Sequence, residues 1–183
     1  MLPKSLTRLL AAPLTALSLL AAPALAQPVT EAQHQALLRA LEDEYLAQAT
    51  YLAVIQRYGV QRPFANILRA EQTHAAMVAG LLRAAGRAVP ENPYLAGKPV
   101  PGFPASESAA CQAGVTAEIA NIRLYDRELL PVMRGHDQAT AVLTRLRNDS
   151  EQRHLPAFQR CAQGGRTGGQ GMGRGGGQGR GRM

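Results

Sequence analysis

The stretches Glu71-Gln-Thr-His74 and Glu151-Gln-Arg-His154 decide the fold that we predict for this chain. In each, a carboxylate and an imidazole stand three residues apart, and on an α-helix such residues leave the same face. One pair can therefore offer an oxygen and a nitrogen ligand to one metal ion. The spacing alone is weak evidence, because the nine Glu and four His of residues 27–183 give about 0.2 such pairs by chance.

A lone Glu and a Tyr precede each pair. Glu44 is followed by Tyr51 and Glu118 by Tyr125, in both cases seven residues or two helical turns later. The repeat predicts two helical hairpins packed about a pseudo-twofold axis, with four Glu and two His brought together between them. This ligand set is known from helix bundles that bind two metals through carboxylates. The predicted metal ligands are Glu44, Glu71, His74, Glu118, Glu151 and His154.

The pseudo-symmetry assigns roles within this set. We expect Glu71 and Glu151 to bridge two metals, and each ion to take one further Glu and one His. Four carboxylates and two divalent cations make a neutral site, which removes the repulsion among buried carboxylates. Iron or manganese suits oxygen-rich ligation with one imidazole per metal, and zinc is a competitor. Tyr51 and Tyr125 are candidates to orient the carboxylates by hydrogen bonds, with plain packing as the alternative.

Other acids are weaker candidates as ligands. Glu42 and Asp43 adjoin Glu44, but the Tyr at the seventh position favours Glu44. A third pair, Glu31-Ala-Gln-His34, lies about 15 Å farther along the helix axis and cannot join the same centre. We therefore expect Glu31 to be an ordinary acid of the first helical turn.

The apolar periodicity predicts helices only. The first opens with the capping box Thr30-Glu31-Ala-Gln33 and ends at Gly59, and the others cover about 63–85, 107–130 and 137–161. Pro131 should end or kink the third helix, and His136 should be a solvated turn residue. Residues 87–105 hold five Pro and two Gly, so they cannot be helical and are long enough to cross a bundle. A plain connector is the expectation there, and a lid over the site is the alternative.

Both ends of the chain differ from its middle. Residues 1–26 have the pattern of a removable signal peptide, with Lys4 and Arg8 before an apolar run and Ala24-Leu-Ala26 at the cleavage site. An uncleaved anchor is the alternative. Residues 162–183 are mostly Gly, Arg and Gln, with too little apolar surface to fold. The two cations of the leader and four of the tail account for most of the net charge of +7 and leave +1 for residues 27–161. We therefore expect one folded domain, 27–161, that binds no nucleic acid and spans no membrane.

Two cysteines in an exported chain favour a disulfide over free thiols. Cys111 lies seven residues before Glu118, and Cys161 lies seven after His154. A short turn makes the last two helices antiparallel, so both cysteines lie about 10 Å from the metal level toward the same end. The spacing predicts a Cys111–Cys161 disulfide.

Further segments carry a resemblance to a known family: Ala40-Leu-Glu-Asp-Glu-Tyr45, Arg62-Pro-Phe-Ala-Asn-Ile67, Ala117-Glu-Ile-Ala-Asn-Ile122, Leu124-Tyr-Asp126 and His154-Leu-Pro-Ala-Phe158. Over residues 30–161 the chain resembles the ferritin-like superfamily, which includes bacterioferritin and rubrerythrin. It is most similar to an uncharacterised branch of exported bacterial ferritin-like domains. The resemblance implies an all-α, ferritin-like four-helix bundle with a long Pro/Gly-rich crossover between helices two and three. It also places the six ligands at di-iron positions.

The resemblance implies iron chemistry with oxygen or peroxide. We expect an exported, periplasmic or secreted protein with two iron ions that oxidises Fe²⁺ or reduces oxygen or peroxide. A non-catalytic metal-binding or scavenging protein is the alternative. The chain lacks a rubredoxin-type four-cysteine centre, and Asn121 stands where rubrerythrins carry an extra Glu. A Gly/Arg tail replaces a fifth helix, so a ferritin cage is not expected, while a dimer is left open.

Overall fold

The computed structural model describes residues 28–164, so the predicted signal peptide and nearly all of the Gly/Arg-rich tail lie outside it. Within these residues the chain is all-helical and has no strand. The long helices are α1 (Glu31–Tyr58), α2 (Phe64–Ala84), α3 (Glu107–Leu124) and α5 (Asp137–Asp149). The π-helical turn η1 (Tyr125–Leu129) joins α3 to α4 (Leu130–Val132), and η2 (Ser150–His154) joins α5 to α6 (Leu155–Ala162).

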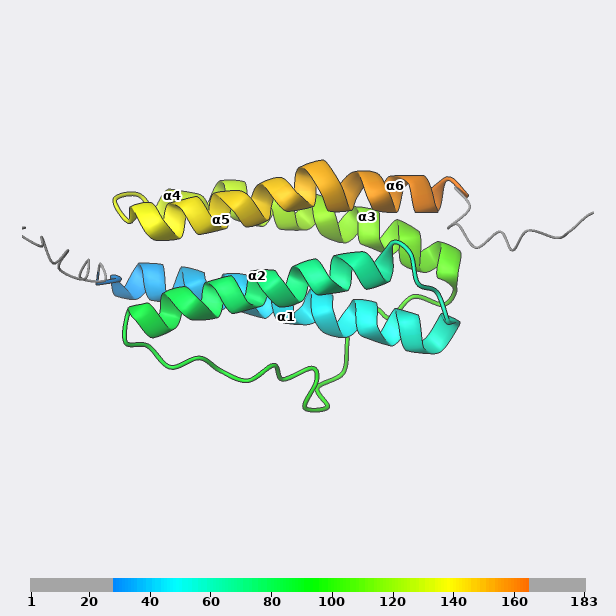
Figure 1. Ribbon diagram of the computed structural model, residues 1–183, viewed down its shortest axis with the longest axis horizontal. Helices are drawn as coiled ribbons and strands as arrows, with labels where there is room; N and C mark the ends of the chain where they lie inside the picture. The colour runs from blue at the N-terminus through cyan, green and yellow to red at the C-terminus, as the bar shows by residue number, and fades with distance from the viewer. Residues whose placement is uncertain (1–27, 165–183) are drawn as a thin grey trace, which may run out of the picture.

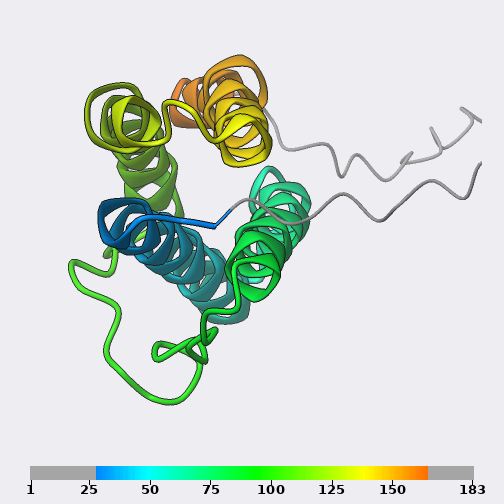
Figure 2. The ribbon, with the colours of Figure 1, turned by 90° about the vertical axis from the view of Figure 1, so that its left-hand side faces the viewer.

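The helices lie as two adjacent pairs (Figure 1). Viewed from the end, α1 and α2 form one pair, and α3 lies beside the α5–α6 stretch as the other (Figure 2). The long connection between α2 and α3 runs outside α1, to which tyrosine hydroxyls attach it. Tyr45 donates a hydrogen bond to the carbonyl of Pro90 (3.0 Å), and Tyr58 donates one to that of Pro104 (2.6 Å). The connection is therefore held against α1 although it is not helical.

The helix ends follow local capping chemistry. Thr30 and Gln33 form the predicted capping box, and Gly59 ends α1 with a φ of 66°, which favours glycine. Ser106 caps α3 by accepting from the backbone N–H of Ala109 (3.1 Å). The prediction for His136 was wrong: this residue is 5% exposed and caps α5, with Nδ1 accepting from the Ala139 N–H (3.3 Å). An imidazole that folds back onto the helix end replaces water as the partner of that N–H.

Two apolar clusters fill the interior, one on each side of the level of the Glu-x-x-His pairs. The first includes Leu37, Leu41, Val78, Leu82, Tyr125 and Leu143. The second includes Tyr51, Val54, Phe64, Ile67, Cys111 and Phe158. On α1, α2 and α3 the buried carboxylates fall between the members of the two clusters. Along the helix axes, the buried carboxylates thus have an apolar cluster on each side.

Each π-helical turn ends two residues before a proline. The backbone N–H of Leu130 bonds to the carbonyl of Tyr125, and that of Leu155 bonds to the carbonyl of Ser150, five residues back instead of four. A proline ring in an α-helix clashes with the carbonyl four residues earlier. The wider turns accommodate Pro131 and Pro156, so the helix continues past Pro131 to Val132.

The predicted disulfide is confirmed. Cys111 of α3 and Cys161 of α6 are bonded, with their Cα atoms 5.6 Å apart. Gly114 permits the close approach of these helices, because a Cβ atom there would meet the ring of Phe158 at 2.5 Å. Among the described helices, none is both long and apolar enough to cross a membrane.

Replacing both cysteines with serine should lower the free energy of unfolding by about 4 kcal/mol, because the cross-link closes a loop with a sequence separation of 50. Denaturant titration of the oxidised protein and the double variant measures the difference. Thiol titration of denatured, unreduced protein should find none at either position. Two free thiols per chain, or equal unfolding midpoints, would contradict the assignment.

Candidate metal centre

Five of the six predicted ligands meet between the helices, each only 2–3% exposed. They are Glu44 from α1, Glu71 and His74 from α2, Glu118 from α3 and His154 from η2. The five form two groups that share one member: Glu44, Glu71 and His74 in one, and Glu71, Glu118 and His154 in the other. Within each group the potential ligand atoms lie within 4.8 Å of one another, so each could hold a metal ion.

The carboxylate of Glu71 lies between the two imidazoles. Its Oε2 is 2.9 Å from Nδ1 of His74, and its Oε1 is 3.1 Å from Nδ1 of His154. The two rings are roughly stacked, with centroids 5.6 Å apart. One carboxylate therefore presents one oxygen to each half of the site, which is the geometry that a bridging ligand needs.

The remaining carboxylates complete the two halves. Oε2 of Glu44 lies 3.3 Å from Nδ1 of His74, and Oε2 of Glu118 lies 3.6 Å from Nδ1 of His154. Both imidazoles thus turn the same ring nitrogen, Nδ1, toward the carboxylates. The Glu44–His74 contact of α1 and α2 therefore has a counterpart in the Glu118–His154 contact of α3 and η2.

Two buried tyrosines fix the outer oxygens of these carboxylates. Tyr51 donates a hydrogen bond to Oε1 of Glu118 (2.9 Å), and Tyr125 donates one to Oε1 of Glu44 (2.6 Å). Each tyrosine therefore bonds the carboxylate of the other half, not the Glu seven residues before it. Burial and the adjacent carboxylates raise the pKa of both phenols well above the ordinary value, so both remain donors.

When no metal is bound, the neighbouring Glu and His charges determine which of these side chains are protonated. Burial disfavours the charged imidazoles, but the facing Glu44 and Glu71 carboxylates raise the pKa of His74 to about 10. In the same way, Glu118 and Glu71 raise the pKa of His154 to about 9. Burial acts against the charged form of Glu71 too, yet the two imidazoles that face its carboxylate hold its pKa far below the usual range. Burial and the nearby Glu71 charge raise the pKa of Glu44 well above its usual value.

The prediction for Glu151 does not match the structure. Its side chain is 46% exposed and pairs with Arg147, which also binds Asp126. The cause is η2: in this wider turn, residues three apart no longer share a face, whereas residues four apart do. Ser150 and His154 accordingly are both buried. Glu151 faces solvent, and Glu71 remains as the one carboxylate shared by both groups.

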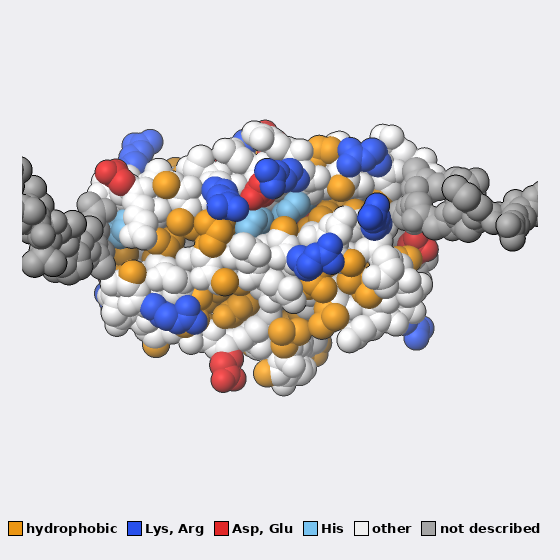
Figure 3. Space-filling model, in the orientation of Figure 1, with side chains coloured by type: hydrophobic (Ala, Val, Ile, Leu, Met, Phe, Trp, Pro, Cys, Tyr) orange, Lys and Arg blue, Asp and Glu red, His pale blue; other side chains and the backbone are white. Residues whose placement is uncertain are grey.

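Asp149 is a residue that the sequence did not reveal. Its Oδ2 lies 3.4 Å from Nε2 of His74, on the side of the ring away from the carboxylates. Arg145 and Arg153 lie 3.8 and 3.2 Å from the same aspartate. Figure 3 shows basic side chains around a small visible patch of histidine on this face. No spacing rule links Asp149 to His74, because they are 75 residues apart on separate helices.

The remaining acids near Glu44 have other partners. Glu42 accepts hydrogen bonds from Tyr94 (2.6 Å) and Lys98 (2.9 Å) in the long connection. Asp43 accepts one from Nδ2 of Asn121 (2.6 Å) across to α3. Glu31 is exposed and lies 3.4 Å from His34, so this third Glu-x-x-His pair is separate from the centre.

The donor atoms of the centre fit a divalent cation. Nδ1 of His154 is buried and makes no hydrogen bond, although it lies close to two carboxylates. A buried ring nitrogen without a hydrogen bond is costly, and a metal ion that displaces its proton would use its lone pair. The three buried Glu carry three negative charges and two divalent cations carry four positive ones. Asp149, against the outer nitrogen of His74, supplies a further negative charge.

Comparison with known proteins found no matching family model, no matching curated protein and no matching solved structure.

Glu71→Ala should lose most of the bound metal, because it removes the carboxylate shared by both groups. Glu151→Ala is the matched control and should retain its metal, because this side chain lies outside the centre. The measurement is metal content per chain after loading with Mn²⁺ or Fe²⁺ and desalting. Equal metal content in the two variants would contradict the assignment.

Metal binding should release protons, at least about two per chain at pH 7, because an imidazole must be neutral to bind a metal. The pKa values of about 10 for His74 and 9 for His154 mean that both imidazoles hold their protons at pH 7 in the metal-free state. Raising the pH from 6.5 to 8 should therefore strengthen Mn²⁺ binding. Calorimetric titration in buffers of different ionisation enthalpy counts the protons, and Glu151→Ala should give the same number. Binding without proton release would show that the imidazoles are not ligands.

Proposed function

We propose that this protein is an exported dinuclear metal protein that oxidises Fe²⁺ or reduces oxygen or peroxide. In this proposal the helices form a ferritin-like four-helix bundle, and residues 85–106 are its crossover. The all-helical chain and the outward course of this connection support that interpretation. The observation that carries the proposal is the Glu71 carboxylate, whose two oxygens each approach a separate imidazole.

Different residues would bind each of the two metal ions, and others would orient these ligands. Glu44 and His74 would hold one ion, Glu118 and His154 the other, and Glu71 would bridge them. Tyr51 and Tyr125 orient the outer carboxylate oxygens, and Asp149 fixes the ring of His74. The two apolar clusters separate the carboxylates from solvent along the helix axes.

Two iron ions in this centre would supply two electrons together, the number needed to reduce peroxide to water. The donor set favours iron or manganese, because it is rich in carboxylate oxygen and contains one imidazole per ion. Three protein ligands for each ion leave coordination positions open, so a small oxidant has room to bind. A zinc-filled site would have no redox step.

Export is the proposed location. The Cys111–Cys161 disulfide supports it, since such bonds persist in oxidising compartments. The periplasm or the exterior of the cell would then be the place where the protein meets metal and oxidant. The second candidate function is non-catalytic metal binding. The same buried donors favour it, because affinity for a cation needs no reaction.

The metal-free protein should be loaded with two Fe²⁺ per chain without oxygen and then mixed with oxygen or peroxide. Iron oxidation, followed by absorbance, should be faster than for free Fe²⁺ and slower in Glu118→Ala, which loses a ligand. Glu128→Ala, an exposed acid farther along the same helical stretch, is the matched control and should behave as the unchanged protein. Iron that binds but oxidises no faster than free Fe²⁺ would replace the catalytic function with simple metal binding.

A further inference from the structure

A cavity of about 460 Å³ lies between α1 and α3, beside the long connection. Pro101 and Pro104 of that connection line one side, and Glu71 and Glu118 are also among the lining residues. Ala113 of α3 lines the cavity and is exposed, so the cavity is open to solvent. Six waters occupy about 180 Å³, at about 30 Å³ each. The cavity therefore has room for a hydrated divalent cation.

The cavity leads to one half of the candidate metal centre. Glu71 and Glu118 line it, whereas Glu44 and His74 do not. Nδ1 of His154 makes no hydrogen bond and lies 3.1 Å from Oε1 of Glu71 and 3.6 Å from Oε2 of Glu118. A cation that moves from the cavity to these two carboxylates would therefore reach a nitrogen donor next to them.

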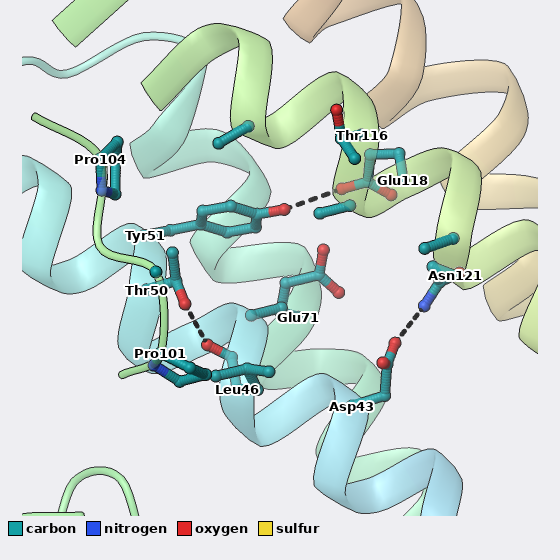
Figure 4. A pocket seen from close by; sticks show the side chains of 15 residues that line it. Asp43, Leu46, Thr50, Tyr51, Glu71, Pro101, Pro104, Thr116, Glu118 and Asn121 are labelled. Atoms are coloured by element: carbon teal, nitrogen blue, oxygen red, sulfur yellow. Dashed lines mark hydrogen bonds between the residues drawn. The ribbon is translucent and has the colours of Figure 1, made fainter. Parts of the chain in front are cut away.

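Asp43 adds a carboxylate that the centre does not use. This residue is half-buried and lines the cavity, and its Oδ2 accepts a hydrogen bond from Nδ2 of Asn121 (2.6 Å). Because an amide carries no charge, the bond does not neutralise the carboxylate. Figure 4 shows this bond on one side of the Glu71 carboxylate and the Tyr51–Glu118 bond on the other. Asp43 thus offers negative charge in the cavity, next to the ligands.

The cavity wall has no positive charge. No Lys, Arg or His is among the described residues that line it. Arg39, four residues before Asp43 on α1, is exposed and is not part of the wall. Much of the wall is apolar, and beside such a wall the attraction between a carboxylate and a cation is stronger than in open water. A divalent cation is therefore attracted into the cavity.

A second approach to the centre, past Asp149, is less favourable. Asp149 contacts His74 there, but Arg145 and Arg153 lie 3.8 and 3.2 Å from the same aspartate. The one acid beside His74 on this face therefore already has two cationic partners. Both arginines are exposed, and Figure 3 shows basic side chains around the visible histidine. An approaching metal ion would meet charges of its own sign first.

We propose that divalent metal ions enter the centre through this cavity and that Asp43 attracts them into it. The ion moves from Asp43 to Glu71 and Glu118, and it avoids the arginines beside Asp149. This inference rests on the proposed function, because a route into the centre requires that the centre binds metal. It gives Asp43 a role separate from that of a ligand: this carboxylate sets how fast metal is taken up and not how much is held.

The rate of Mn²⁺ uptake tests the role of Asp43. Metal-free protein is mixed rapidly with Mn²⁺ and a fluorescent indicator that reports the free ion. Asp43→Asn keeps an acceptor oxygen for Asn121 and removes the charge. Uptake at low ionic strength should slow about threefold or more, with the metal content at saturation unchanged. The difference should shrink at high salt, because ions screen the attraction.

A charge placed at the cavity wall tests the route itself. Ala113→Lys should slow Mn²⁺ uptake about twofold or more, and Ala113→Glu should accelerate it by a similar factor. Gln112→Lys and Gln112→Glu are the matched controls and should have smaller effects, because Gln112 is the exposed neighbour of Ala113 and does not line the cavity. Arg153→Gln removes a positive charge from the other approach and should leave the rate nearly unchanged. Equal effects at positions 112 and 113, or faster uptake in Arg153→Gln than in Ala113→Glu, would overturn the route.

The metal content at saturation, measured on the same samples, separates this proposal from the proposed function. If the unchanged protein takes up no Mn²⁺, the metal centre and the route both fail. If it binds Mn²⁺ at a rate that neither Asp43→Asn nor the Ala113 variants alter, the route alone is overturned and the centre stands.

Discussion

The two contacts of the Glu71 carboxylate, one to each imidazole, hold together a set of charges that would otherwise repel one another. Three carboxylates lie between the helices at 2–3% exposure, and burial disfavours the charged state of each. Protons on the imidazoles compensate in the metal-free protein, and cations would do so in the loaded one. The rest of the structure brings these charges together. Helices from both halves of the chain place them at one level, and an apolar cluster lies on each side of that level.

Much of this arrangement could be predicted from the sequence, because regular α-helices convert spacing into direction. The helix bounds follow from local signals such as the capping box at Thr30, and the cysteine pairing follows from turns of 3.6 residues. The convergence of Glu44, Glu71, His74 and Glu118 has the same origin, since each lies within an uninterrupted helix. The tyrosine partners were less predictable. Sharing a face with Glu44 placed Tyr51 at the right level, but Tyr51 on α1 bonds Glu118 on α3.

The failures fall where the backbone departs from the α-helix or where contacts cross between helices. Glu151 was expected inside because a regular helix was assumed, and η2 turns it toward Arg147. Asp149 reaches His74, and Asn121 reaches Asp43, over sequence separations that no periodicity encodes. A π-helical turn has no strong signal of its own in a single sequence. Here its only trace is the proline that follows each one, two residues beyond its end.

The η2 turn makes the set of side chains at the centre depend on the number of residues in this segment of the chain. A π-helical turn amounts to one extra residue within an α-helix. Loss of a single residue just before Glu151 would restore the regular turn and return Glu151 to the face of His154, at the cost of a clash between Pro156 and the helix before it. A deletion in this segment, accompanied by replacement of Pro156, would therefore convert a centre with one shared carboxylate into one with two. The length of the chain in this segment thus sets how many carboxylates face both imidazoles, with every side chain of the set still present.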